Sequence, residues 1–245
     1  MLKQPITRWI FLNVSLAVLG LFTGIPKAHA VEAQGVTRQV LVEATADGLT
    51  EGKYHMRAVE ITVEPGGFMS EHTHGGPGAR YMLSGSITSM EDGQSKTYTA
   101  GQGFAETPQV HHSYKNEGSE PAKILVFEVL PLGETKAMAA QEKKGVTSKV
   151  MLEKEVDGLT AGKYKMILAH IKFAPGGFVG EHTHQGPGIR LVRSGSMTIR
   201  TDSKTDMYKG GDYYFEPAGT HMARVEADKN QETEFLIFEV RPADK

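Results

Sequence analysis

The sequence predicts an all-β protein made of two copies of one sandwich or barrel domain. Short segments rich in β-branched and aromatic residues, such as residues 55–63 and 167–173, alternate at close intervals with Pro-Gly-Gly, Ser-Gly and Asp-Gly turns. Many short strands divided by regular turns are typical of antiparallel sandwiches and barrels. Two further observations support this class: a repeat of whole-domain length, and a histidine-rich segment that the repeat preserves.

The repeat is an internal duplication. Residues 47–50 (DGLT) return unchanged as residues 157–160, and residues 65–68 (PGGF) return as residues 175–178. Both pairs have an offset of 110 in residue number. Stacked structural repeats have much shorter periods, of about 20–50 residues. A whole domain has therefore been copied within the chain.

Four parts of the chain follow from this repeat. We expect a leader over residues 1–30, a first barrel domain over 31–132, a linker over 133–148 and a second barrel domain over 149–245. Residues 134–144 are rich in alanine, lysine and glutamate and contain no glycine, so some helix is expected in the linker.

The leader resembles a secretory signal peptide. Lys3 and Arg8 precede a mostly apolar run over residues 9–22, and residues 28–30 (AHA) have the small-x-small pattern of a cleavage site. The apolar run is shorter than the roughly 20 residues that a membrane-spanning helix needs. We therefore expect export to the periplasm or outside of a bacterial cell, with no stable membrane anchor after cleavage.

Composition excludes several classes of function. The chain has 27 Lys and Arg residues against 29 Asp and Glu residues, and it has no basic run, so a nucleic-acid partner is not expected. It contains no cysteine. Disulfides, thiol catalysis and thiolate metal ligands are therefore excluded, and stability must come from packed cores and bound metal.

The segment that carries chemistry is residues 71–74 (EHTH). It is followed by GPG at residues 76–78 and by Arg80, and the whole pattern returns at residues 181–190. Two histidines spaced two positions apart on a strand point to the same face, because strand side chains alternate. Two converging imidazoles supply half of a metal site.

A third histidine follows in each copy. We pair His112 with His221 at an offset of 109, and this pairing leaves the neighbouring His111 unmatched. The three histidines that both copies retain are then the candidate metal ligands. They are His72, His74 and His112 in the first copy and His182, His184 and His221 in the second.

These motifs resemble those of the cupin superfamily, once in each copy, so the chain is similar to a bicupin. The resemblance implies two tandem antiparallel β-barrels of the double-stranded β-helix type, each holding a metal through three histidines and one glutamate. The residues that match the first motif are Gly66, His72, His74 and Gly85, and those that match the second are Gly211, Pro217, Gly219 and His221; residues 108–112 and Asn116 form a looser version.

Both copies depart from the family at the glutamate ligand. Its position, four residues after the second histidine, is occupied by Gly78 and Gly188. Three imidazoles alone suit iron, nickel, zinc or copper and leave coordination positions open for water or substrate. The missing carboxylate disfavours manganese (Mn), which prefers oxygen ligands. A divalent transition metal is the expected cofactor.

Arg80 and Arg190 follow two residues after these glycines, and strand alternation would place them on the same face. A guanidinium beside a metal can bind a carboxylate or enolate oxygen, so both are candidate substrate-binding residues for a small anionic ligand. The alternative is a salt bridge with Glu71 or Glu106, or with their counterparts in the second copy. Glu106 could also act as a general base or replacement ligand, although a surface or hydrogen-bonding role is favoured.

Three classes of function fit this site. Family members with three histidines and no glutamate resemble dioxygenases of diketones, which favours a dioxygenase-like oxidoreductase acting on a small acidic or enolisable organic substrate. The resemblance disfavours oxalate decarboxylase because of Gly78 and Gly188. The alternatives are a non-catalytic periplasmic ligand-binding cupin and a structural cupin. The sequence identifies no catalytic residue, and it leaves open enzyme status and the choice between monomer and homodimer.

Overall fold

The structure is a computed structural model that describes residues 31–46, 49, 51–133, 137–160 and 162–243. The expected signal peptide over residues 1–30 lies outside the described residues. Within the described residues every regular element is a strand, which confirms the all-β class. No helix in this part of the chain is long and apolar enough to cross a membrane.

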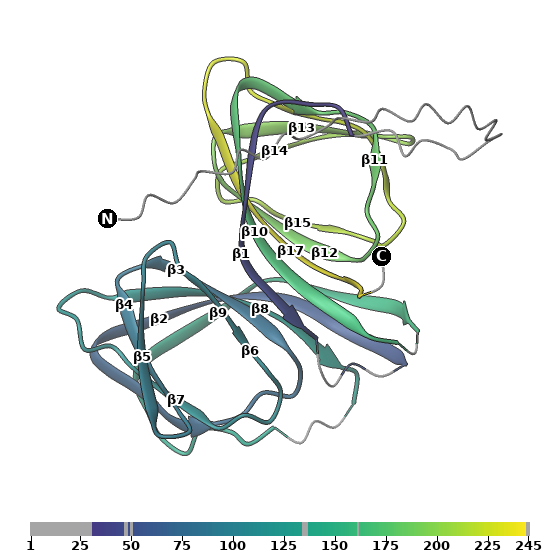
Figure 1. Ribbon diagram of the computed structural model, residues 1–245. Coiled ribbons are helices and arrows are strands. Elements are labelled where there is room, and N and C mark those ends of the chain that lie inside the picture. The colour runs from purple at the N-terminus through teal and green to yellow at the C-terminus, as the bar shows by residue number, and fades with distance from the viewer. Residues whose placement is uncertain (1–30, 47–48, 50, 134–136, 161, 244–245) are drawn as a thin grey trace, which may run out of the picture. The chain divides into compact units, whose positions relative to one another are not determined.

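The first of two antiparallel sheets has eight strands in the order β5-β4-β7-β2-β8-β3-β6, with β9 paired to β2 (Figure 1). Runs rich in β-branched residues form its long strands, and left-handed glycines such as Gly66 and Gly85 mark its bends. The strands are β2 (Gly52–His72), β3 (Gly78–Ser84), β4 (Ser86–Glu91), β5 (Gln94–Thr99), β6 (Gly103–Glu106), β7 (His112–Lys115), β8 (Ala122–Pro131) and β9 (Lys143–Leu159).

The second sheet repeats this order as β14-β13-β16-β10-β17-β12-β15, with β1 paired to β10 and the short β11 paired to β16. The correspondence of the two orders confirms that one barrel domain was duplicated. The strands are β1 (Ala33–Thr45), β10 (Tyr164–Val179), β11 (His182–Thr183), β12 (Gly188–Ser194), β13 (Ser196–Thr201), β14 (Thr205–Lys209), β15 (Tyr213–Glu216), β16 (His221–Ala227) and β17 (Thr233–Pro242).

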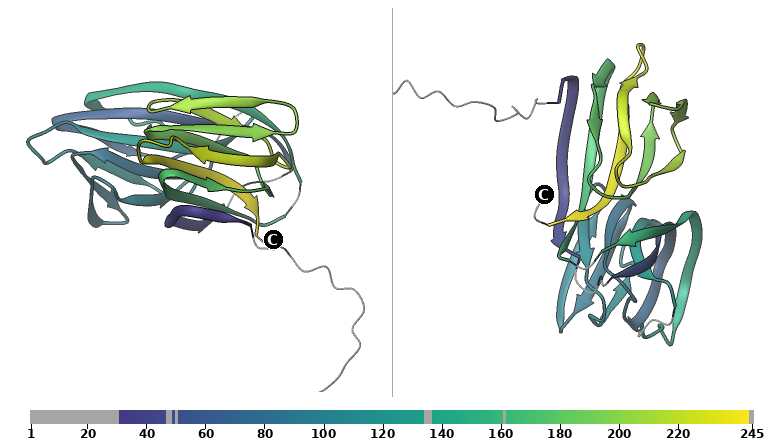
Figure 2. Two further views of the ribbon diagram at one scale, coloured as in Figure 1. Left: turned by 90° about the horizontal axis from the view of Figure 1, so that it is seen from above. Right: turned by 90° about the vertical axis from the view of Figure 1, so that its right-hand side faces the viewer.

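The first strand of each copy is exchanged between the barrels. In β1, Val40 lies opposite Ala169 of β10, and in β9, Val150 lies opposite Val59 of β2. Figure 2 shows β1, in purple, alongside the green strands of the second barrel. This pairing differs from the division expected from the sequence, which assigned β1 to the first barrel and residues 149–159 to the second.

The helix expected in the linker is absent from residues 137–144; residues 134–136 lie outside the described residues. Instead, Lys143 and Lys144 open β9 and pair with the end of β2. Residues before them are tied to the same segment, since Met138 N donates to Thr73 Oγ1 at 2.7 Å and Ser70 N donates to Glu142 O at 2.9 Å. An isolated helix of this length is marginal in water, so these strand contacts determine the conformation.

A shared core cluster packs residues of both barrels together. At its centre, the fully buried rings of Phe127 in β8 and Phe238 in β17 are stacked, with centroids 5.2 Å apart. Two side-chain hydrogen bonds also link the copies: Tyr213 Oη donates to Glu60 at 2.8 Å, and Arg193 donates to Tyr81 Oη at 2.9 Å. The barrels therefore share one core in addition to the exchanged strands.

Replacing Phe127 by Ala is expected to lower the free energy of unfolding by about 3–5 kcal/mol, because it leaves a cavity in the shared core. Urea denaturation followed by circular dichroism measures the change, with the half-exposed Val150→Ala in β9 as the control. A double-mutant cycle with Phe238→Ala should give a coupling of about 0.5–1.5 kcal/mol. Independent unfolding of the two barrels, with no coupling, would contradict the shared core.

Candidate metal centre

Three histidines of the first barrel converge. His72 at the end of β2 lies directly opposite His112 at the start of β7, and opposed residues on antiparallel strands project to the same face. His74 follows two residues after His72, and one ligand nitrogen from each ring lies within 4.8 Å of the others. The Nε2 atoms of His74 and His112 are 3.0 Å apart. The structure thus brings together the three histidines of the first copy that the sequence singles out.

The backbone fixes the tautomer of His72. Its Nδ1 lies 2.9 Å from Ser70 O and donates a hydrogen bond to it, so Nε2 carries the lone pair. That buried Nε2 has no hydrogen-bond partner among the described residues. An unsatisfied buried acceptor is costly, and a metal ion would satisfy it. The cluster therefore fits a divalent metal ion.

Burial also keeps the histidines in the form that binds metals. Desolvation lowers the pKa of His72, and it lowers the pKa of His112 to about 4 despite the opposing charge of Glu106. These imidazoles are therefore neutral at pH 7, with a lone pair available for coordination.

A buried ion pair stands beside the cluster. Arg80 of β3 is 2% exposed; its Nη2 pairs with Glu106 Oε2, and its Nη1 donates to Phe127 O at 3.2 Å. The same Glu106 oxygen lies 2.9 Å from His74 Nε2. Burial alone would raise the pKa of Glu106, but Arg80 and His74 outweigh burial and lower the pKa to about 2.

This ion pair is the salt-bridge alternative raised from the sequence. Arg190 pairs in the same way with Glu216, at 2.7 Å. Substrate binding by Arg80 and Arg190 stays a prediction, and it would require a substrate anion to compete with an existing carboxylate. The expectation of a surface position for Glu106 is wrong, because this side chain is buried against the histidines; its polar contacts with Arg80 and His74 agree with the hydrogen-bonding role that was the other expectation.

The arginines explain why the family glutamate is missing. A Cβ atom added at Gly78 would collide with Arg80 Nη1 and lie 2.5 Å from Phe127 O. A Cβ atom at Gly188 would likewise collide with Arg190 Nη1 and lie 2.5 Å from Phe238 O. Any side chain at these positions would displace the guanidinium or the neighbouring strand, so glycine is required.

A cavity of about 220 Å³ opens onto the first cluster. Its polar end contains His72, His74, Arg80 and the Arg57–Glu128 ion pair, with Glu128 Oε2 3.8 Å from His74 Nδ1. The remaining walls are largely apolar, so the cavity suits a small organic molecule with one polar end. They are formed by Val59, Ile61, Val63, Met69, Phe104, Tyr114, Ile124, Val126 and Ser148.

The second barrel has a methionine where the first has its third histidine. His182 lies opposite Met222, whereas His221 lies opposite Thr183. Because His72 lies opposite His112, Met222 occupies the position of His112. Met222 is also equally buried, at 2% exposure. The pairing of His221 with His112, which was expected from the residue numbering, is therefore wrong.

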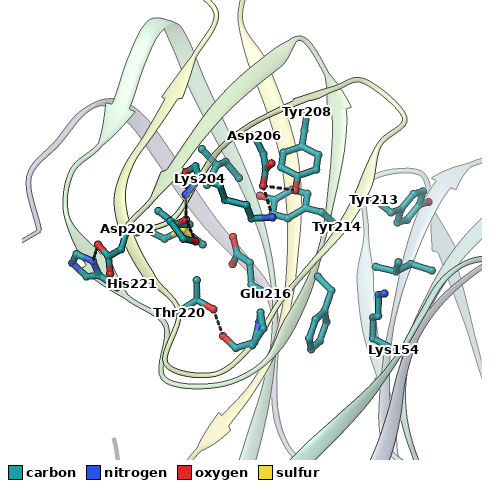
Figure 3. A pocket seen from close by; sticks show the side chains of 17 residues that line it. Lys154, Asp202, Lys204, Asp206, Tyr208, Tyr213, Tyr214, Glu216, Thr220 and His221 are labelled. Atoms are coloured by element: carbon teal, nitrogen blue, oxygen red, sulfur yellow. Dashed lines mark hydrogen bonds and ion pairs between the residues drawn. The ribbon is translucent and has the colours of Figure 1, made fainter.

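His221 corresponds instead to the exposed His111. His221 pairs with Glu181 at 2.9 Å, as His111 pairs with Glu71 at 3.1 Å. Asp202 also pairs with His221, and these two carboxylates raise the pKa of His221 by hydrogen bonding. Figure 3 shows His221 at the edge of a cavity of about 670 Å³, well apart from Glu216.

A single extra residue separates the two copies at this point. In the first barrel, Glu91 and Met90 of β4 pair with the consecutive residues His112 and Ser113. In the second barrel, Thr201 pairs with Met222 and Arg200 pairs with Arg224, which leaves Ala223 unpaired in a β-bulge. The offset between the copies is therefore 110 up to Met222 and 111 beyond it.

The other groups of the second site keep their places. His182 Nδ1 lies 2.8 Å from Gly180 O, and His184 Nε2 lies 3.2 Å from Glu216 Oε2. Burial and the nearby Arg190 lower the pKa of His184 to about 3. A cavity of about 470 Å³ opens onto these residues. Over the described ranges, however, the first barrel's histidines form the sole cluster of three metal-ligating groups among His, Cys, Asp and Glu.

Comparisons with known proteins agree with this fold. Residues 59–128 match the family model described as a cupin domain, and residues 137–242 match the ChrR cupin-like domain. The structure is similar to a Bacillus subtilis oxalate decarboxylase studied for its Mn(II) centres, with 16% identity, a TM-score of 0.54 and coverage of 82% of this chain and 76% of that one.

Two further solved structures are similar. A variant of the same decarboxylase, with a tryptophan replaced by tyrosine, has 15% identity, a TM-score of 0.56 and coverage of 82% of this chain and 76% of that one. AerE from Microcystis aeruginosa has 15% identity, a TM-score of 0.54 and coverage of 82% of this chain and 98% of that one. The comparison with curated protein sequences gave no match.

The two domain matches and the fold place the chain in the cupin superfamily. With one cupin barrel from each copy of the duplicated sequence, it is a bicupin, and the three-histidine cluster makes it a metal-binding cupin.

We expect one tightly bound metal ion per chain, because only the first barrel offers three imidazoles to one point among the described residues. Elemental analysis of the purified protein measures this stoichiometry. His112→Asn should remove the ion, whereas His221→Asn, the matched control on the second copy, should leave metal content unchanged. Two tightly bound ions in the unmodified protein would contradict this assignment.

A histidine at the position of Met222 should create a second site, since it would complete the pattern of His72, His74 and His112. Met222→His is therefore expected to raise the stoichiometry from one ion to two under metal-saturating conditions. Ala223→His, placed on the bulge residue next to it, serves as the control and should not bind a second ion. An unchanged stoichiometry for Met222→His would show that the two positions are not equivalent.

Proposed function

We propose that this protein is an exported metal-dependent oxidoreductase, dioxygenase-like, that acts on a small acidic or enolisable organic substrate in its first barrel. The observation that supports this most directly is the convergence of three histidines beside a cavity of about 220 Å³, whose polar end His72 and His74 line. Export is supported by the leader pattern of residues 1–30 alone.

His72, His74 and His112 would hold the metal. When bound, the metal would supply Lewis-acid polarisation of a substrate oxygen and open coordination positions. Imidazole ligands are compatible with iron, nickel, zinc and copper. Manganese stays a candidate as well, since the fold is shared with a protein that has Mn(II) centres.

Glu128 is the carboxylate best placed for proton transfer. It lines the cavity, it is 4% exposed, and Arg57 holds its other oxygen in an ion pair. An enolisable substrate bound in the cavity would have to lose a proton, and a buried carboxylate near the metal can accept it. The apolar walls would exclude water and would enclose the rest of the substrate.

The alternative is a non-catalytic cupin that binds a ligand or serves a structural role. One observation favours this for the second barrel: Met222 replaces the third histidine, so that barrel has fewer ligands for a catalytic metal. The two barrels can differ in this respect without contradiction, because a duplicated domain can retain its fold after losing its site. We therefore assign the proposed reaction to the first barrel only.

Glu128→Gln is expected to lower the turnover number by about 100-fold or more while metal content stays at the unmodified level. Oxygen consumption by the metal-loaded protein, screened across keto acids, diketones and flavonols, measures the activity. Glu239→Gln, the matching change in the second barrel, should leave turnover unchanged. Tight ligand binding without oxygen consumption would favour the non-catalytic alternative, and no rise in melting temperature with any metal would favour a structural role.

A further inference from the structure

We infer that Glu106 is a fourth metal ligand, which replaces from strand β6 the carboxylate that β3 lacks at Gly78. The inference deepens the proposed metal site and rests on it. It assigns to the first barrel a set of three imidazoles and one carboxylate, and it gives a role to the acid that the reaction proposed above does not use.

The register of the sheet supports this exchange of positions. Gly78 in β3 lies directly opposite Glu106 in β6. Side chains of directly opposed residues project to the same face, with Cβ atoms about 4.5–5.5 Å apart. A glutamate at position 106 can therefore reach the same part of the barrel interior as a glutamate at position 78. The carboxylate would then come from β6, the strand next to β3.

Two distances from Glu106 fit coordination of one ion together with His74 and His112. Atoms that bind one metal at about 2.1 Å lie roughly 3.0–3.4 Å from one another. Glu106 Oε2 is 2.9 Å from His74 Nε2, and His74 Nε2 is 3.0 Å from His112 Nε2. Glu106 Oε1 is 3.8 Å from His112 Nε2. The carboxylate thus faces two of the three ring nitrogens as well as Arg80.

One carboxylate oxygen of Glu106, Oε1, is also available to a metal ion. Glu106 is 5% exposed, and neither oxygen has a hydrogen-bond partner of good geometry among the described residues. Oε2 is held by the buried guanidinium of Arg80 and lies 2.9 Å from His74 Nε2, whereas the ion-pair contact of Oε1 is the longer one, 3.8 Å from His112 Nε2. A buried ionic oxygen left in this state is costly unless a cation completes its environment.

A carboxylate ligand would change the choice of metal. Oxygen donors favour Mn²⁺ and Fe²⁺ relative to a site of imidazoles alone, which suits copper and zinc. Arg80 then has a positioning role: its Nη2 pairs with Glu106 Oε2 and lies 3.3 Å from His74 Nε2, while its Nη1 is anchored to Phe127 O. With this ligand, the absence of a glutamate at position 78 would no longer disfavour manganese, which the sequence ranks below the other metals.

The test is the affinity of metal-free protein for Mn²⁺ and Zn²⁺, measured by competition with a fluorescent chelator. Glu106→Gln keeps the shape of the side chain and should weaken Mn²⁺ binding by about 100-fold or more. Mutation of a residue that only orients a ligand already lowers metal affinity by about 10–100-fold, and loss of a ligand itself should cost at least as much. Zn²⁺ binding should weaken less. Glu216→Gln, the equivalent change in the second barrel, should leave both affinities unchanged.

Two further variants separate a ligand from an ion-pair partner. Glu106→Gln leaves Arg80 buried without a carboxylate, so the double variant Glu106→Gln with Arg80→Met removes both charges and keeps the barrel neutral. It should fold and should also lose Mn²⁺ affinity. Arg80→Met alone should retain Mn²⁺ affinity within about tenfold. Equal losses in Arg80→Met and Glu106→Gln would overturn the inference, because Glu106 would then act only through the ion pair.

The outcome for His112→Asn distinguishes this inference from the metal site on which it rests. If His112→Asn loses the metal and Glu106→Gln binds Mn²⁺ as tightly as the unmodified protein, the three-histidine site stands and Glu106 is not a ligand. If His112→Asn also binds metal normally, the proposed site itself is wrong. Loss of Mn²⁺ affinity in both variants, with Glu216→Gln unaffected, supports the inference.

Discussion

The buried guanidinium of Arg80 is the group on which the arrangement of the site depends. A charge taken out of water must be paired and hydrogen-bonded, and Glu106 and Phe127 O meet this requirement. The guanidinium occupies the space beside residue 78, which must then be glycine. One buried charge thus explains the missing family ligand, the buried acid on β6 and the Gly-x-Arg pattern that the sequence repeats.

A comparison of the two barrels distinguishes the buried ion pair from the histidine triad. Gly188, Arg190 and Glu216 preserve the glycine, the arginine and the acid in the second barrel, whereas Met222 replaces the third histidine. The ion pair therefore contributes to the barrel itself, independently of a complete histidine triad. The first barrel combines the pair with the triad, and this combination is what defines its chemistry.

The fold could be predicted largely from the sequence, because the repeat and the turn residues are visible without knowing which strands pair. The exchange of β1 and β9 between the barrels could not be predicted from the sequence. These strands are copies of one segment, and either copy could pair with β2 or with β10. The choice depends on the path of the chain. The helix expected over residues 134–144 is absent from the described residues 137–144 for a similar reason, because contacts with β2 and the residues that follow it override local helix propensity.

The site was predicted in part. The spacing of His72, His74 and His112 is a local signal, and the structure brings these residues together. His221 was assigned to the wrong counterpart because a one-residue bulge at Ala223 is invisible to spacing alone. A signal was present: an unbroken offset of 110 aligns His221 with His111 and the left-handed Gly219 with the left-handed Gln109. The burial of Glu106 could not be predicted from the sequence, because it depends on the pairing of β6 with β3.

The most direct test of the proposed metal centre is a crystal structure of the protein loaded with Mn²⁺, with the ion located by its anomalous scattering. The expected result is a single ion in the first barrel, bound by His72, His74, His112 and a carboxylate oxygen of Glu106, and no ion between His182 and His184. An ion held by the histidines with Glu106 turned away, or an equally occupied site in the second barrel, would contradict it.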